Sequence, residues 1–232
     1  MFGCYEFGES VKLDTVEIET YEDSGLYLYH RKSDREVTKV IPSASTLVIN
    51  PVEPVMQPKE ITHYLLVEMK KPISLAPLSH LVFFLTFPVE IGTYVSVKKD
   101  MEHIDSFTLT NPKYTLYGIP HKGIICKFWE SDVYSTIPDV KPYHEGVMKV
   151  DLQNTSNSWA ELRKIVFDAY YMKIFYSTFA SMSTLVKIYG NQARTSFIEE
   201  PLLGDMKKAV ELLRLRKIPG VEKREFLMEL GL

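Results

Sequence analysis

One stretch of the chain gathers several residue types that bind metals. The segment PHKGIICKFWESDVYSTIPDVKPYHEG contains His121, Cys126, Glu130, Asp132 and His144. A zinc site needs three or four such ligands converging at about 2.0–2.3 Å. His121 and Cys126 are five positions apart, so on a strand they point to opposite faces. The spacing therefore favours the alternative interpretation, in which Cys126 is a buried apolar side chain and both histidines are loop residues at strand ends.

A second stretch, KKDMEHID, could carry acid–base chemistry. It places Glu102, His103 and Asp105 together, and a carboxylate paired with an imidazole can act as a general base. A polar hairpin tip between two strands has the same composition, and this is the favoured interpretation.

A metal enzyme or a metal-dependent sugar-binding protein is kept as an alternative function. In a jelly-roll protein of that kind, the divalent metal would be held by His103, His121 and His144. Cupin-type sites have a closely spaced histidine pair, and this sequence has none. We therefore predict no cofactor outside this alternative, and we favour a protein that is not an enzyme.

Other chemistries lack their motifs. The sequence contains no GxSxG, GxxxxGK[ST] or GxGxxG pattern, which argues against nucleotide hydrolysis and dinucleotide-dependent redox chemistry. The net charge of −3 gives no long-range attraction to phosphate backbones, so nucleic acid is not expected as the main partner.

The aromatic residues suggest a binding face. The chain has 14 tyrosines, 12 phenylalanines and two tryptophans, more than a modest core needs. We predict that Tyr114, Tyr117, Trp129 and Tyr134 contact a carbohydrate, a peptide or another protein. A protein interior filled with aromatic rings explains the same content, and it is the somewhat favoured interpretation.

Short strands must position these residues. Alternating or apolar runs recur at intervals of roughly ten residues from Val11 onward, separated by turn signals such as Glu-Asp-Ser-Gly at 22–25. The run from Val11 to Ile18 slips phase once, at Thr15-Val16, and reads as one strand. We predict a two-sheet antiparallel β-sandwich, jelly-roll-like, over residues 1–200. Its buried residues should include Leu66, Val82, Phe84, Val89, Val95, Ile125, Met148, Val150, Val166, Ile174 and Val186.

One segment fits both a helix and a strand. In LRKIVFDAYYMKIFY, Leu162, Ile165 and Val166 also lie on one helical face. The β-branched and aromatic content favours two strands with a bend at Asp168-Ala169.

After Pro201 the pattern changes to helical spacing. LLGDMKKAVELLRLRK and VEKREFLMELGL predict an α-helical hairpin over residues 201–232. We expect its apolar face to make a homodimer, with packing on the sandwich or on another protein as alternatives. The interspersed glutamates argue against a membrane surface. The residues expected at this interface are Met206, Val210, Leu213, Phe226 and Leu230.

The cellular compartment follows from the cysteines and the first residues. Two cysteines, Cys4 and Cys126, are too few for a disulfide framework, and we expect them not to be joined. The opening MFGCYEFGES has no secretory signal character. A cytoplasmic location is predicted.

Several stretches together resemble a known family. MFGCYEFGE, VINPVEPV, YLLVEMKKPI, VFFLTFPVEIGTYV and the runs around ICKFW and LQNTSNSWAEL are similar to an uncharacterised archaeal family, a domain of unknown function that spans nearly the whole chain. The resemblance implies a cytosolic archaeal protein and brings no activity, cofactor or catalytic residue. From the residues we therefore predict a cytosolic binding module with an unidentified ligand.

Overall fold

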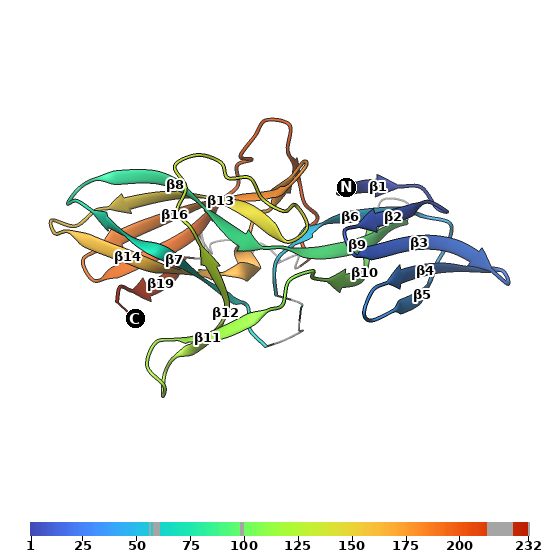
Figure 1. Ribbon diagram of the computed structural model, residues 1–232, viewed down its shortest axis with the longest axis horizontal. Coiled ribbons are helices and arrows are strands. Elements are labelled where there is room, and N and C mark those ends of the chain that lie inside the picture. The colour runs from blue at the N-terminus through green and yellow to red at the C-terminus, as the bar shows by residue number, and fades with distance from the viewer. Residues whose placement is uncertain (56, 58–60, 98–99, 213–224, 232) are drawn as a thin grey trace.

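The protein is built almost entirely from β-strands. The computed structural model describes residues 1–55, 57, 61–97, 100–212 and 225–231, and Figure 1 traces them. They form nineteen strands and one short 3₁₀ turn, η1 (Ala169–Tyr171). The mainly β prediction is confirmed. Within these residues, no helix is long and apolar enough to cross a membrane.

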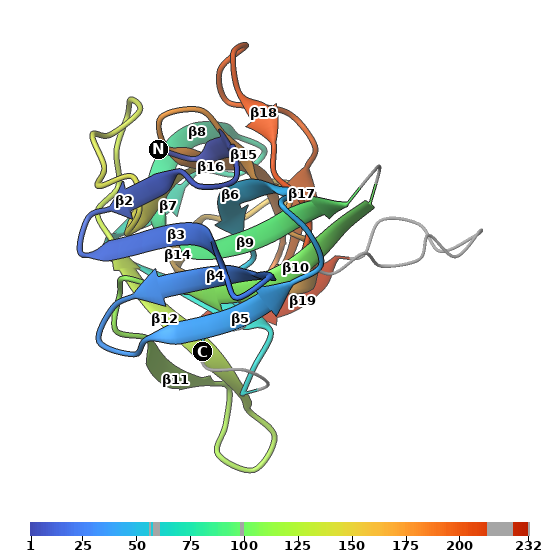
Figure 2. The same cartoon turned by 90° about the vertical axis from the view of Figure 1, so that its right-hand side faces the viewer.

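One end of the molecule consists of two four-stranded sheets. Sheet A has the order β1-β6-β9-β10, and sheet B has the order β2-β3-β4-β5. All pairs within both sheets are antiparallel. Sheet B lies over sheet A in Figure 2. The strands are β1 (Gly3–Tyr5), β2 (Ser10–Leu13), β3 (Val16–Asp23), β4 (Leu26–Lys32), β5 (Val37–Ile41), β6 (Thr46–Val52), β9 (Glu90–Val97) and β10 (Asp100–Phe107).

The other end contains one sheet of four strands and one of seven. Sheet C has the order β11-β12-β7-β14; sheet D has the order β18-β15-β16-β13-β8, with β17 pairing both β16 and β19. The pairs β7–β12 and β13–β16 are parallel. The strands are β7 (Tyr64–Leu75), β8 (His80–Pro88), β11 (Lys113–Tyr117), β12 (Ile124–Ser131), β13 (Glu145–Asn154), β14 (Ala160–Asp168), β15 (Phe175–Tyr176), β16 (Ala180–Tyr189), β17 (Gln192–Ile198), β18 (Lys207–Lys208) and β19 (Phe226–Glu229).

The jelly-roll-like sandwich of two sheets is therefore a wrong prediction. The strands divide among four sheets, and β8 continues almost directly into β9, so that one run of chain belongs to sheet D and then to sheet A (Figure 1). The spacing of apolar runs in the sequence indicates how many strands there are. Which strands pair with each other depends on packing between distant parts of the chain. A single cluster of buried apolar residues nevertheless extends through both ends.

Most of the predicted core residues are buried, and three are not. Leu66, Val89, Val95, Met148, Val150, Val166, Ile174 and Val186 are buried as expected. In β8, Val82 is exposed and Phe84 is half-buried. The inward-facing residues of that strand are instead Phe83, Leu85 and Phe87. Ile125 is also exposed. Successive residues of a strand face opposite sides, so choosing the wrong phase inverts every assignment in that run. Ile125 lies on the uncovered side of β12.

The predicted C-terminal α-helical hairpin is also wrong. The described residues after Pro201 form turns and two short strands, with β18 paired to β15 and β19 paired to β17. Met206 is buried, and its sulfur accepts a hydrogen bond from the Ser181 hydroxyl, with 2.9 Å between sulfur and oxygen. Val210 packs on a cluster formed by β6 and β9. Contacts with existing sheets override helical propensity in this segment. Leu213 lies outside the described residues.

Candidate functional site

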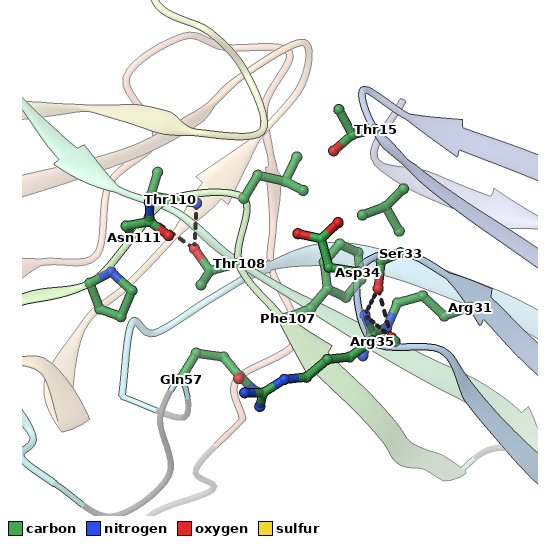
Figure 3. A pocket seen from close by; sticks show the side chains of 13 residues that line it. Thr15, Arg31, Ser33, Asp34, Arg35, Gln57, Phe107, Thr108, Thr110 and Asn111 are labelled. Atoms are coloured by element: carbon green, nitrogen blue, oxygen red, sulfur yellow. Dashed lines mark hydrogen bonds between the residues drawn. The ribbon is translucent and has the colours of Figure 1, made fainter.

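A cavity of about 590 Å³ opens between the two ends of the molecule. It lies where the turns of sheet B, the end of β10 and the following loop meet (Figure 3). Its volume is in the usual range for ligand sites, about 300–1,000 Å³. The lining is Thr15, Val16, Arg31, Ser33, Asp34, Arg35, Gln57, Phe107, Thr108, Leu109, Thr110, Asn111 and Pro112.

Arg31, on β4, is the most constrained charge at this cavity. The residue is only 8% exposed, and its Nε donates to Asp105 Oδ2 at 2.6 Å. Its guanidinium carbon lies 5.0 Å from the centre of the Phe107 ring, close enough for a cation–π contact. The Tyr29 hydroxyl also donates to Asp105, at 3.0 Å. Burial and the Asp105 charge raise the pKa of Tyr29, which stays neutral.

The polar loop between β4 and β5 forms one wall. Arg31 Nη1 donates to Ser33 Oγ at 2.5 Å, and the Ser33 hydroxyl donates to the carbonyl oxygen of Arg35 at 2.7 Å. Such short-range bonds from serine to neighbouring backbone are typical of tight turns. They fix the loop that carries the side chains of Asp34 and Arg35, both of which are exposed.

The opposite wall is the loop that follows β10. The Thr108 hydroxyl donates to the Val89 carbonyl at 3.2 Å, and Thr108 and Thr110 share a hydroxyl hydrogen bond of 2.9 Å. The backbone N–H of Thr110 also donates to the Thr108 hydroxyl. This wall is therefore attached to the junction between β8 and β9.

A buried ion pair lies behind the cavity. Lys127 of β12 contacts Glu90 of β9, and both residues are at most 5% exposed. Lys127 also donates to the Gln57 carbonyl at 2.8 Å, while Gln57 Nε2 donates to the Ser106 carbonyl. Buried pairs of this kind are costly to break, so Gln57 is held firmly at the cavity edge.

The three histidines predicted as metal ligands do not form a metal site together. His103 Nε2 lies 2.6 Å from Ser106 Oγ, and His144 Nε2 lies 2.8 Å from Asp14 Oδ2. His121 is exposed in the turn between β11 and β12. Among the described residues, no group of three histidine, cysteine, aspartate or glutamate side chains could hold a metal ion.

The residues predicted for acid–base chemistry lie in a strand, not in a polar loop. Glu102, His103 and Asp105 lie within β10 rather than at a hairpin tip. Residues 98 and 99, which precede that strand, lie outside the described part of the chain. The Asp105 carboxylate binds Arg31 and Tyr29, so its role is to hold β4 against β10.

Cys126 lies where the alternative interpretation placed it. The side chain is buried in β12, and burial raises the pKa of its thiol to about 12. Cys4 is exposed, and both cysteines are free.

The four aromatic residues predicted to bind a ligand do not line one common hollow. The Tyr117 hydroxyl bonds the backbone of Glu229 in β19, whereas Tyr114 points outward from β11. Trp129 Nε1 donates to Thr86 Oγ1 at 2.9 Å, and Tyr134 makes a backbone bridge to β8. Tyr117 and Trp129 line different hollows of the surface.

The described C-terminal residues pack on the chain's own sheets. The Phe226 ring lies 5.3 Å from that of Tyr64, and Leu230 packs against the main core. The backbone N–H of Leu212 donates to Glu53, which is 2% exposed, at 3.0 Å. Burial raises the pKa of Glu53 to about 7. Homodimer formation stays a prediction.

Sequence reasoning missed the cavity residues. Arg31, Asp34 and Arg35 belong to the run HRKSDRE, which reads as the solvated end of a hairpin. Gln57 and Thr108 come from two distant loops, and no fixed spacing connects the three segments. The one available signal was the density of opposite charges between two strands.

Comparison with known proteins places the chain in a family. Residues 1–229 match the family described as "Protein of unknown function (DUF432)". The chain belongs to this family. No curated protein and no solved structure shows significant similarity to it. Membership of the DUF432 family thus agrees with the resemblance seen in the sequence and adds no activity.

Proposed function

We propose that the protein is a cytosolic binding module, without catalytic activity, whose ligand occupies the cavity between its two ends. The observation that carries the proposal is the cavity itself. It has the volume of a small-molecule site, and its polar lining comes from loops that connect strands of sheets A, B and C. Functional residues commonly lie on loops that a rigid scaffold positions.

The preorganised lining supports binding. Arg31, Ser33 and Thr108 are already held by the hydrogen bonds described above, so a ligand would order few side chains on arrival. Low ordering cost is a general source of affinity. Among the described lining residues, the Asp34 carboxylate makes no hydrogen bond to a serine or threonine hydroxyl that it could activate as a nucleophile.

A cavity-blocking variant tests the proposal. Asn111 is exposed at the cavity edge, so Asn111→Trp should fill the space without disturbing the core. Asn157→Trp, at an exposed position away from the cavity, is the matched control. Amino acids, short peptides, sugars and nucleotides would be screened by thermal shift and confirmed by calorimetry.

We expect at least one compound class to bind the wild type and Asn157→Trp and to lose binding in Asn111→Trp. Binding that is equal in all three proteins would place the ligand elsewhere. A screen in which no compound binds would contradict the proposal.

A further inference from the structure

Two opposite charges face the cavity without neutralising each other. Asp34 and Arg35 are neighbours in the loop between β4 and β5, and both side chains are exposed. In Figure 3 the Arg35 side chain extends across the cavity toward Gln57, and the Asp34 carboxylate points in another direction. Within the described residues, neither side chain makes an ion pair. Each charge is therefore open to a ligand.

Arg31 adds a second set of donors beside Arg35. Its Nε is used by Asp105 and its Nη1 by Ser33 and the Arg35 carbonyl. For its Nη2 the described part of the chain supplies no hydrogen-bond partner. A guanidinium has a planar fork of donors that matches a carboxylate. Because Asp105 and Phe107 already fix Arg31, these donors are preorganised.

The remaining lining narrows the ligand class. Sugars are commonly bound against an open aromatic face, and here the one aromatic residue, Phe107, is buried beneath Arg31. A simple anion would leave the Asp34 carboxylate facing a like charge. A molecule that has a carboxylate at one end and an ammonium group at the other satisfies both charges.

We infer that the ligand is a small zwitterion of the amino acid or short peptide class. Its carboxylate binds Arg35 and Arg31 Nη2, and its ammonium group binds Asp34. The hydroxyls of Thr108 and Thr110 and the Asn111 amide lie on the facing wall, where a peptide backbone can meet them. This inference rests on the proposed function, since it assigns the ligand of the same cavity.

The test uses one peptide in four forms: trialanine, N-acetyl-trialanine, trialanine amide and the doubly blocked peptide. Calorimetric titration measures the affinity of each form. Because a hydrogen bond to a charged group contributes about 1.5–3 kcal/mol, we expect each blocked terminus to weaken binding about tenfold or more.

Two variants assign the termini to their partners. In Arg35→Gln the acid and the amide should bind equally, and in Asp34→Asn the free and acetylated amines should bind equally. Arg163→Gln removes an exposed arginine from β14, remote from the cavity, and should keep all four affinities. Circular dichroism would confirm that each variant is folded.

Different results overturn different claims. Equal binding of all four forms, lost in Asn111→Trp, would refute the zwitterion and keep the cavity as the binding site. Tight binding of inorganic phosphate that is insensitive to Asp34→Asn, without trialanine binding, would reveal a plain anion site and refute the inference. Trialanine binding that survives Asn111→Trp would refute both the inference and the proposed function.

Discussion

Glu53 should make the protein less stable as the pH rises from about 4.5 to 7. Its carboxyl is 2% exposed beneath the C-terminal segment, and burial raises its pKa from 4.5 to about 7. Glu211 nearby raises the pKa further, whereas the Leu212 N–H and Lys173 lower it. Between the two pH values the unfolded chain has released the proton and the native protein retains it. The unfolded state binds fewer protons there, so the free energy of unfolding falls with increasing pH.

The size of this effect follows from the two pKa values. Each pH unit between them corresponds to about 1.4 kcal/mol, which gives a loss of roughly 3 kcal/mol, complete above pH 7. Glu53→Gln removes the charge and keeps an oxygen that can accept the Leu212 N–H. The stability of the variant minus that of the wild type should therefore grow by roughly 3 kcal/mol from pH 4.5 to pH 8.

Urea unfolding, followed by tryptophan fluorescence, would measure this difference at half-unit pH steps. Glu161→Gln is the control, because Glu161 is exposed on β14. The stability difference between that variant and the wild type should stay flat over the same range. A difference for Glu53→Gln that is constant with pH, or that grows toward acid, would refute the reasoning.

Three further predictions follow from packing. Deleting residues 202–232 should lower the melting temperature, because Met206 is buried against Ser181 of β16 and β19 pairs with the edge strand β17 of sheet D; an unchanged thermal unfolding curve would contradict this. Phe87→Ala should cost about 3–5 kcal/mol in urea unfolding and Phe84→Ala clearly less, since only Phe87 is fully buried; equal losses would show that the β8 phase is misassigned. A thiol reagent should label Cys4 in the native protein and Cys126 only after unfolding, and rapid labelling of both would argue against the buried position of Cys126.

Local turn chemistry could be predicted where it is encoded by neighbouring residues. The turn expected at 22–25 is present, and Ser24 and Gly25 both have positive φ, as a two-residue hairpin of this kind requires. The bend expected at Asp168-Ala169 is present too, as Asp168 caps η1 by accepting the Tyr170 N–H. Both features depend on residues a few positions apart.

The interpretation of Val11 to Ile18 as one strand with a phase slip at Thr15-Val16 is wrong. The slip marks the hairpin between β2 and β3, with Asp14 at φ 55°. Alternation resumes after the slip because the chain has reversed direction, and both strands then face the same core.

The sheet pairing and the cavity could not be predicted, because they depend on partners far along the chain. Arg31 and Asp105 are 74 residues apart, and Lys127 and Glu90 are 37 apart. The C-terminal segment fails for a related reason. Met206 and Ala209 fit one helical face in the sequence, but in the structure both are buried against strands and loops formed by distant parts of the chain. A local pattern contains no information about such surfaces.

Strands β7 and β8, which belong to other sheets, separate β6 from its partner β9 along the chain, and this separation has a consequence during synthesis on the ribosome. β6 is buried along almost its whole length and pairs with β9, which is synthesised roughly 40 residues later. At translation rates of about 5–20 residues per second, that edge waits some 2–8 s for its partner. During this interval the nascent chain presents an apolar strand with one edge unpaired, to which chaperones or other unfolded chains can bind. Slow codons placed before β9 would lengthen this exposure, whereas the same codons after β10 would not.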